Sequence, residues 1–260
     1  RGGKTIGALD VAFEGRHKAW TSIPPSSLSA TIDSLWSTTS GFNIQQFSPI
    51  QIYWRQSLMQ GRLRFRLGKL SPYSTFFGNR INSSSLFFVN YAFADNPAVF
   101  MPGNGTGLHV SYDLSPSWTV HGGIQDANGM KTTIDPSSLR LREFWYALQV
   151  DYKAKIRGLG EGTYRLGGWY VDARPEVNAE EGAGTVLSID QELGKHVIAF
   201  LRYEYQGQGL INPEVQFSLL TATRSSARAG IGLPGPFARL PDDYMGVAVA
   251  WGDPADLAIK

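Results

Sequence analysis

The stretch Arg62-Leu63-Arg64-Phe65-Arg66-Leu67 sets the class of fold, because charged and apolar residues alternate in it at every position. Successive side chains of a β-strand point to opposite faces, so a period of two places the arginines on one face and the apolar residues on the other. A helix would mix the two kinds of side chain around its circumference. The stretch therefore predicts a strand with one polar and one apolar face.

The same alternation recurs along the chain and predicts ten more strands. They are Thr5–Phe13, Ile50–Ser57, Leu108–Asp113, Trp118–His121, Phe144–Tyr152, Tyr164–Val171, Thr185–Gln191, Val197–Tyr205, Arg224–Gly232 and Tyr244–Trp251. Short links such as Ser115-Pro116-Ser117 alternate with long links such as 126–142. This order predicts an antiparallel up-and-down meander with short turns at one end and long loops at the other.

Composition excludes several other classes of protein. The 260 residues are 18% charged and 12% aromatic, with no Cys and a net charge of +2. The aromatic content excludes a disordered chain, and the lack of Cys removes disulfides and thiolate chemistry. The balanced charge favours no nucleic-acid partner. The longest uncharged stretch, 34–54, contains Ser, Thr, Asn and Gln throughout, so we expect no membrane-spanning helix.

Short turns opposite long loops, with an apolar face on every strand, are typical of a bacterial outer-membrane barrel. Aromatic residues such as Trp118, Tyr152 and Tyr244 stand near strand ends, where interfacial girdles lie in such barrels. We therefore predict an all-β fold, a transmembrane antiparallel up-and-down β-barrel. The alternative is a soluble β-sandwich that binds polysaccharide, in which the apolar faces of two sheets would form a core. Its exposed platform would be made of Trp145, Trp169 and Trp251.

Several short motifs resemble the carbohydrate-selective porin family of Gram-negative bacteria, often called the OprB family. They are Gly61–Leu70, Phe87–Asn90 with Asn96-Pro97, Pro102–Gly107, Gln125–Gly129, Gly162–Tyr170 and Leu240–Gly252. The resemblance implies a sixteen-stranded, largely monomeric barrel in the outer membrane, in contact with lipid and lipopolysaccharide, that passes glucose-type sugars by facilitated diffusion. Eleven strands leave open edges that lipid cannot satisfy. We therefore expect residues 1–260 to be one barrel domain, incomplete at both ends.

By the resemblance, Arg64 and Arg66 are the first candidates for the channel constriction, with Glu204 and Asp126 as balancing carboxylates and Trp169 as a stacking platform. Sugar hydroxyls exchange hydrogen bonds with planar donors and carboxylates, and sugar C–H faces pack on aromatic rings. For each arginine, an electrostatic lining without solute contact is the alternative role; for Trp169, it is a packing or girdle position. The predicted channel lining comprises Arg62, Arg64, Arg66, Asp126, Arg165, Trp169, Arg202 and Glu204.

The link 71–106 is long for a loop and carries its own apolar run, Leu86-Phe87-Phe88-Val89. We expect it to fold inward as a constriction loop or to pack as a short helix; the alternative is that it caps the barrel mouth. The side chains expected to meet a sugar there are Asn79, Arg80, Asn82, Asn90 and Asn96.

Signals for catalysis are weak. Residues 230–235 fit the dinucleotide pattern G-x-G-x-x-G only in letters, because Pro236 and a turn follow instead of a helix. No nucleophile elbow, zinc-protease helix or P-loop occurs, so we expect no enzyme and no cofactor. His109, His121 and Asp113 offer a weak metal site, but polar lining is the favoured role and no metal is predicted. The closest rival function is an anion-selective or general porin, because an arginine stripe also attracts phosphates.

Overall fold

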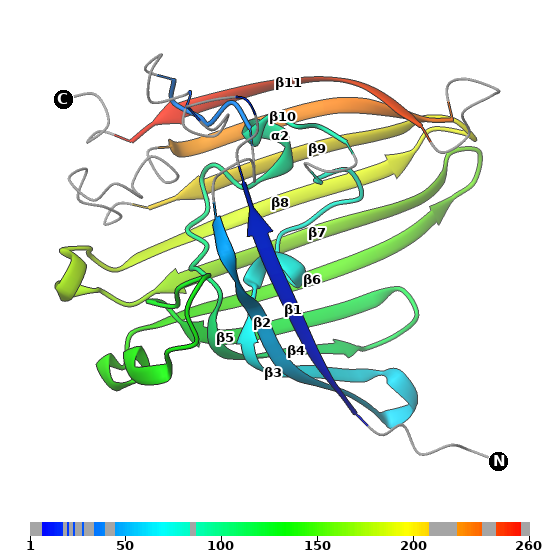
Figure 1. Cartoon of the computed structure of the whole chain (residues 1–260). Coiled ribbons are helices and arrows are strands. Elements are labelled where there is room, and N and C mark those ends of the chain that lie inside the picture. The colour runs from blue at the N-terminus through cyan, green and yellow to red at the C-terminus, as the bar shows by residue number, and fades with distance from the viewer. Residues whose placement is uncertain are drawn as a thin grey trace.

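The computed structural model describes residues 7–17, 20, 23, 28, 34–39, 45–83, 87–207, 223–235 and 243–255. Eleven strands form one sheet in chain order, and each strand pairs with the next (Figure 1). They are β1 (Ala8–Arg16), β2 (Gln45–Leu58), β3 (Leu63–Leu70), β4 (Gly105–Asp113), β5 (Trp118–Asp126), β6 (Phe144–Ile156), β7 (Gly160–Val171), β8 (Gly182–Glu192), β9 (Ile198–Gln206), β10 (Thr223–Pro234) and β11 (Tyr244–Pro254). All eleven predicted strands and the up-and-down order are confirmed. Residues 5 and 6 of the first predicted strand lie outside the described residues.

The links alternate in length as predicted. The β2–β3 link, residues 59–62, contains the 3-10 turn η2 (Met59–Gly61), in which Met59, Gln60 and Gly61 all have positive φ. At the other end of the sheet, the β3–β4 link runs from Ser71 to Asn104 and the β5–β6 link from Ala127 to Glu143. Among the described residues, no helix is long and apolar enough to cross a bilayer.

Strand β5 is longer than the sequence predicts, since it continues from His121 to Asp126. Gly122 and Gly123 interrupt the alternation of side chains, which is why the pattern ends early, but their backbone stays paired with β4 and β6. The absence of a side chain at Gly123 has a structural use: a Cβ there would lie 2.6 Å from Cζ of Phe76. The glycine therefore makes room for the segment that follows β3.

The sheet exposes its apolar face. Large apolar side chains point outward and remain exposed, for example Leu166 (62%), Leu201 (45%) and Val249 (71%). The alternate positions, such as Arg165 and Arg202, lie on the inner face with polar neighbours. One sheet with an exposed apolar face is the reverse of a sandwich, whose apolar faces would cover each other. The β-sandwich alternative is therefore wrong.

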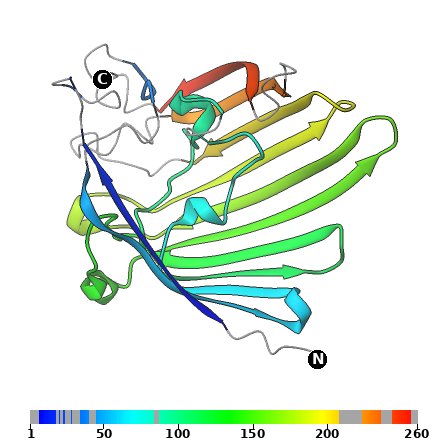
Figure 2. The same cartoon turned by 45° about the vertical axis from the view of Figure 1, so that its right-hand side comes forward.

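The core lies on the inner face, where the β3–β4 link packs against the sheet. This inward segment, residues 71–104, contains the 3-10 turn η3 (Pro72–Ser74) and the helix α2 (Tyr91–Ala94). Its described parts, residues 71–83 and 87–104, run inside the curve of the sheet (Figure 2). Phe76 and Phe77 meet the ring of Trp145 edge to face at 5.5 and 6.4 Å. Burying each such ring contributes roughly 1.5–3 kcal/mol. Leu86 of the apolar run lies outside the described residues, whereas Phe87 and Phe88 contact Tyr244 and Phe200.

Candidate functional site

A polar cavity of about 430 Å³ lies on the inner face between the start of the inward segment and the first strands. Its polar lining combines guanidinium, hydroxyl and imidazole groups from five elements. These are Arg55 and Ser57 on β2, Arg64 and Arg66 on β3, Ser74 and Thr75 on the inward segment, His109 and Ser111 on β4, and His121 on β5. The cavity therefore offers many hydrogen-bond donors and acceptors at short spacing.

Arg66 is the cation of this cavity that keeps its charge unbalanced. Its Nη1 donates to Oγ of Ser74 at 2.9 Å and to Oγ1 of Thr75 at 3.4 Å, and its guanidinium lies 5.8 Å from the ring centroid of Tyr53. Within the described part of the chain, no carboxylate forms an ion pair with it. Because a guanidinium stays protonated at any working pH, Arg66 presents a permanent positive charge to the cavity.

The two other arginines of the cavity are paired with carboxylates. Arg64 forms a bidentate pair with Asp113, with Nη–Oδ distances of 2.6 and 2.8 Å. Arg55 donates from Nε to Asp10 at 2.6 Å. Arg62 lies in the turn before β3 and donates to the carbonyls of Asp113 and Leu114, while its guanidinium lies 5.4 Å from the ring of the outward-facing Tyr112. The structure thus brings Arg64 and Arg66 together at the cavity and places Arg62 outside it.

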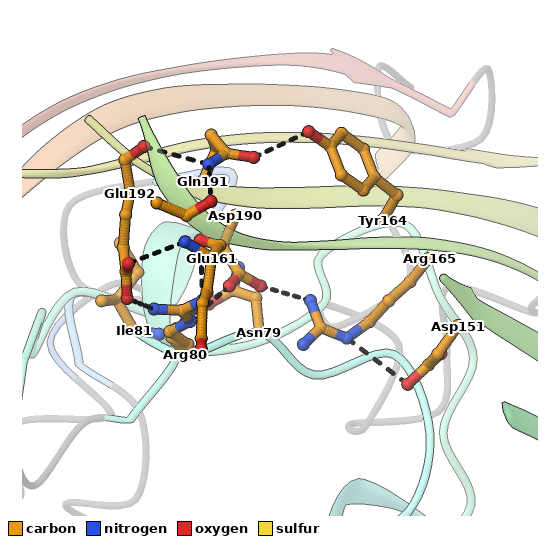
Figure 3. Close-up of polar contacts among 11 residues, drawn as sticks. Asn79, Arg80, Ile81, Asp151, Glu161, Tyr164, Arg165, Asp190, Gln191 and Glu192 are labelled. Atoms are coloured by element: carbon orange, nitrogen blue, oxygen red, sulfur yellow. Dashed lines mark hydrogen bonds and ion pairs between the residues drawn. The ribbon is translucent and has the colours of Figure 1, made fainter. Parts of the chain in front are cut away.

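A chain of alternating charges crosses the inner face beyond the cavity (Figure 3). Arg80 of the inward segment pairs with Glu192 at 2.8 Å and with Asp190 at 2.7 Å. Arg165 pairs with the same Asp190 and lies 3.8 Å from Asp151. Arg165 of the predicted lining and Arg80 of the predicted constriction loop therefore both form ion pairs with carboxylates of the sheet.

Arg202 and Glu204 are not open to a channel. Their side chains are 1% and 0% exposed, because the inward segment covers this part of β9. They pair with each other at 2.8 Å and contact backbone groups of the segment. In this arrangement neither side chain reaches a solute.

Trp169 and Asp126 do not lie at an open channel wall, where a stacking platform and a balancing carboxylate were expected. Trp169 faces inward as its parity requires, but it is 4% exposed and packs beside Phe100, with ring centroids 6.4 Å apart. Asp126 follows the inward-facing Gln125, so it lies on the opposite face of β5. Its carboxylate accepts hydrogen bonds from the backbone N–H of Asn128 at 2.9 Å and from the hydroxyl of Ser138. Packing and loop closure are the roles that these contacts support.

Two asparagines of the inward segment accept hydrogen bonds from its own backbone. Oδ1 of Asn79 accepts from the N–H of Ile81 at 2.9 Å, and Oδ1 of Asn90 caps α2 by accepting from the N–H of Ala92 at 2.8 Å. Asn96 is buried and accepts from Arg202. Asn82 is half-buried.

The helix α2 of the inward segment carries a buried tyrosine, Tyr91. Burial is the main cause that raises the pKa of Tyr91 well above its ordinary range.

The histidines have separate partners. Nδ1 of His109 lies 3.1 Å from Oγ1 of Thr75, and Nδ1 of His121 lies 2.8 Å from Oγ of Ser111. The carboxylate of Asp113 forms an ion pair with Arg64. The described residues include no group of three His, Cys, Asp or Glu that could hold a metal ion. Residues 230–234 end β10, which confirms the predicted strand end, and the N–H of Gly235 donates to the carbonyl of Asp243. Pro236 and the predicted turn lie outside the described residues.

Sequence reasoning missed the hydroxyls of Ser74 and Thr75 as partners of Arg66. They lie eight and nine residues further along the chain, and only the folding back of the inward segment brings them to β3. No local pattern in the sequence signals this contact. The contact of Arg228 with the carbonyl of Ala92 on α2 depends in the same way on the path of the segment.

An inverted antiparallel sheet that holds a long segment and a polar cavity on its inner face defines the porin class of outer-membrane proteins. A family model described as the carbohydrate-selective porin, OprB family, matches residues 26–188. The chain belongs to this family, which is a family of transport channels.

Two solved structures share the fold. The high-pH structure of Pseudomonas putida OprB has a TM-score of 0.65 and 17% sequence identity, over 86% of this chain and 59% of that chain. The low-pH structure of Pseudomonas putida OprB has a TM-score of 0.51 and 16% identity, over 79% and 52%. The chain thus spans little more than half the length of these structures. A search of curated proteins found no match.

Proposed function

We propose that the protein lets carbohydrates of the glucose type diffuse passively across the outer membrane through a polar lumen in which Arg66 contacts the solute. The observation that supports this function is the cavity of about 430 Å³ with an unbalanced guanidinium and several hydroxyls on its wall. The proposal includes an integral outer-membrane location, contact with lipid and lipopolysaccharide on the apolar face, a monomeric barrel, and an inward segment that narrows the channel.

The chemistry of the cavity suits a neutral sugar. Planar N–H donors and hydroxyls can replace the water around sugar hydroxyls, and the ring of Tyr53 beside Arg66 adds an apolar surface for C–H groups. None of these groups binds strongly alone. A channel needs sites that are favourable to enter and weak enough to leave, and such a set of modest contacts satisfies both conditions.

A second candidate function, anion selectivity, is favoured by one specific observation. Arg64 and Arg55 are paired with carboxylates, but no carboxylate of the described residues pairs with Arg66. A fixed positive charge in a narrow passage concentrates anions. The two functions differ in what they predict for a neutral solute, so an experiment can separate them.

The decisive experiment measures solute entry into liposomes that contain the full-length protein. Glucose, other sugars and size-matched amino acids are compared by the rate of liposome swelling, and reversal potentials in a salt gradient report ion selectivity. A carbohydrate channel admits sugars faster than amino acids of equal size. Equal rates for all solutes would contradict sugar selectivity, and a strong anion preference without a sugar preference would support the second function.

The matched variants are Arg66→Gln and Arg62→Gln, because the two arginines lie four residues apart but only Arg66 lines the cavity. A hydrogen bond from a charged donor contributes about 1.5–3 kcal/mol. Its loss in Arg66→Gln should therefore lower the rate of sugar entry roughly tenfold or more. Arg62→Gln should behave as the wild type. Equal effects of the two substitutions would show that Arg66 has no special contact with the solute.

A further inference from the structure

Two arginines and a glutamate form a buried cluster between the sheet and the inward segment. Arg202 and Glu204 lie on β9, and Arg228 lies opposite Arg202 on β10. All three side chains are almost completely buried. Nε of Arg202 lies 2.8 Å from Oε1 of Glu204, and Nη2 of Arg228 donates to the same oxygen.

Each member of this cluster also holds the backbone of the inward segment. Arg202 donates to the carbonyl of Phe77 and to Oδ1 of Asn96. Arg228 donates to the carbonyls of Ala92, at 2.7 Å, and of Asp95. Glu204 accepts from the N–H of Ala98 at 3.0 Å. The three side chains therefore hydrogen-bond the segment near its beginning, at Phe77, and towards its end, between Ala92 and Ala98.

The contacts of the cluster also affect the cavity, through the backbone between Thr75 and Phe77. The carbonyl of Phe77, held by Arg202, lies only two residues from Thr75, whose hydroxyl contacts both Arg66 and His109. A shift of the backbone at Phe77 would therefore move the hydroxyl partners of Arg66. The described parts of the segment run inside the curve of the sheet (Figure 2), so a change in the position of the segment would change how much of that interior it fills.

Burial distinguishes this cluster from a solute site. Buried ion pairs add little net stability because both charges lose their hydration, but removal of one partner leaves a buried charge without compensation. The forked donors of an arginine hold two acceptors at a fixed spacing, which a flexible lysine does not. Such a cluster is suited to fixing one arrangement of the segment.

We propose that Arg202, Glu204 and Arg228 are positioning residues that clamp the inward segment to β9 and β10 and thereby set the bore and the sugar preference of the channel. This inference rests on the proposed channel function. It assigns these residues a role without any solute contact, and it makes the clamp a determinant of selectivity.

The test compares Glu204→Gln with Asp253→Asn in the full-length protein. Asp253 is a matched control because it pairs with Arg224 between β10 and β11, but both side chains are partly exposed. Single-channel conductance in KCl across a planar bilayer reports the bore, and liposome swelling reports sugar preference. Heat-modifiable gel mobility confirms that each variant is folded. We expect Glu204→Gln to raise the conductance about twofold and to reduce the sugar preference several-fold, while Asp253→Asn leaves both unchanged.

A second pair of variants changes a residue of the inward segment, Asn96, in place of a residue of the sheet. Asn96→Ala removes one of the two acceptors that Arg202 has on the segment, leaves the residues of the sheet unchanged, and should change the conductance in the same direction as Glu204→Gln. Asn96→Asp keeps an oxygen at that place and should retain the wild-type conductance. If Glu204→Gln does not fold, the contrast between the two Asn96 variants decides the question.

Wild-type conductance and sugar preference in both Glu204→Gln and Asn96→Ala would overturn the clamp, as would an equal change in Asp253→Asn. A wild-type protein that conducts ions without preferring sugars would contradict the proposed function alone, because the conductance ratio still reports whether the clamp sets the bore.

Discussion

Replacing Leu166 by arginine tests whether the apolar face of the sheet contacts lipid. Leu166 lies in the middle of β7, opposite the outward-facing Val150 and Leu187, and is 62% exposed. Arginine on the lipid face costs roughly 2–4 kcal/mol near the bilayer midplane and about 0–1 kcal/mol near the interfaces. We therefore expect Leu166→Arg to lower the free energy of unfolding by about 3 kcal/mol.

The assay is urea unfolding of the protein folded into lipid vesicles, followed by tryptophan fluorescence. Leu159→Arg is the control, because Leu159 is partly exposed in the short turn between β6 and β7, where water is near. It should cost less than about 1 kcal/mol. On a water-exposed face, both substitutions would change stability by only about 0.5 kcal/mol. An equal and small effect at the two positions would refute the inverted sheet.

Three further predictions concern the inward segment. Phe77→Ala removes a buried ring beside Trp145 and should destabilise the packed segment by about 3–5 kcal/mol, seen as faster proteolysis within residues 71–104. Gly123→Leu places a Cβ 2.6 Å from Phe76 and should displace the segment at a cost of about 1–3 kcal/mol; wild-type proteolysis would contradict the close approach. The pKa of Tyr91 is raised above its ordinary value of 10.0, mainly by burial and then by Asp95. A raised folded pKa means that its stabilising contribution is present below pH 10 and is lost at higher pH, so alkaline release of the segment should weaken in Tyr91→Phe.

The strands could be predicted because their signal is local. Alternation in residues such as Arg64 and Phe65 follows from the geometry of one strand, and the order of short and long links then fixes antiparallel neighbours. Strand β5 shows the limit of this reasoning. Gly122 and Gly123 carry no side chain, so the pattern that marks a strand disappears although the backbone pairing continues.

The candidate site could be predicted only in part. Parity placed Arg66, Arg202 and Trp169 correctly on the inner face. Parity cannot tell which part of that face stays open, because a distant segment covers it. Arg66 lines a cavity, whereas Arg202 and Trp169 lie beneath the inward segment.

The period of two, the contrast between turns and loops, and the family motifs are properties of neighbouring residues, and they were sufficient to establish an inverted antiparallel sheet of the OprB family. The division of the inner face between cavity and clamp required the fold in three dimensions. Phe77 and Arg202 are separated by 125 positions in the chain and meet only because the link after β3 folds back into the curve of the sheet. That contact depends on buried aromatic packing and paired charges, which no local pattern encodes.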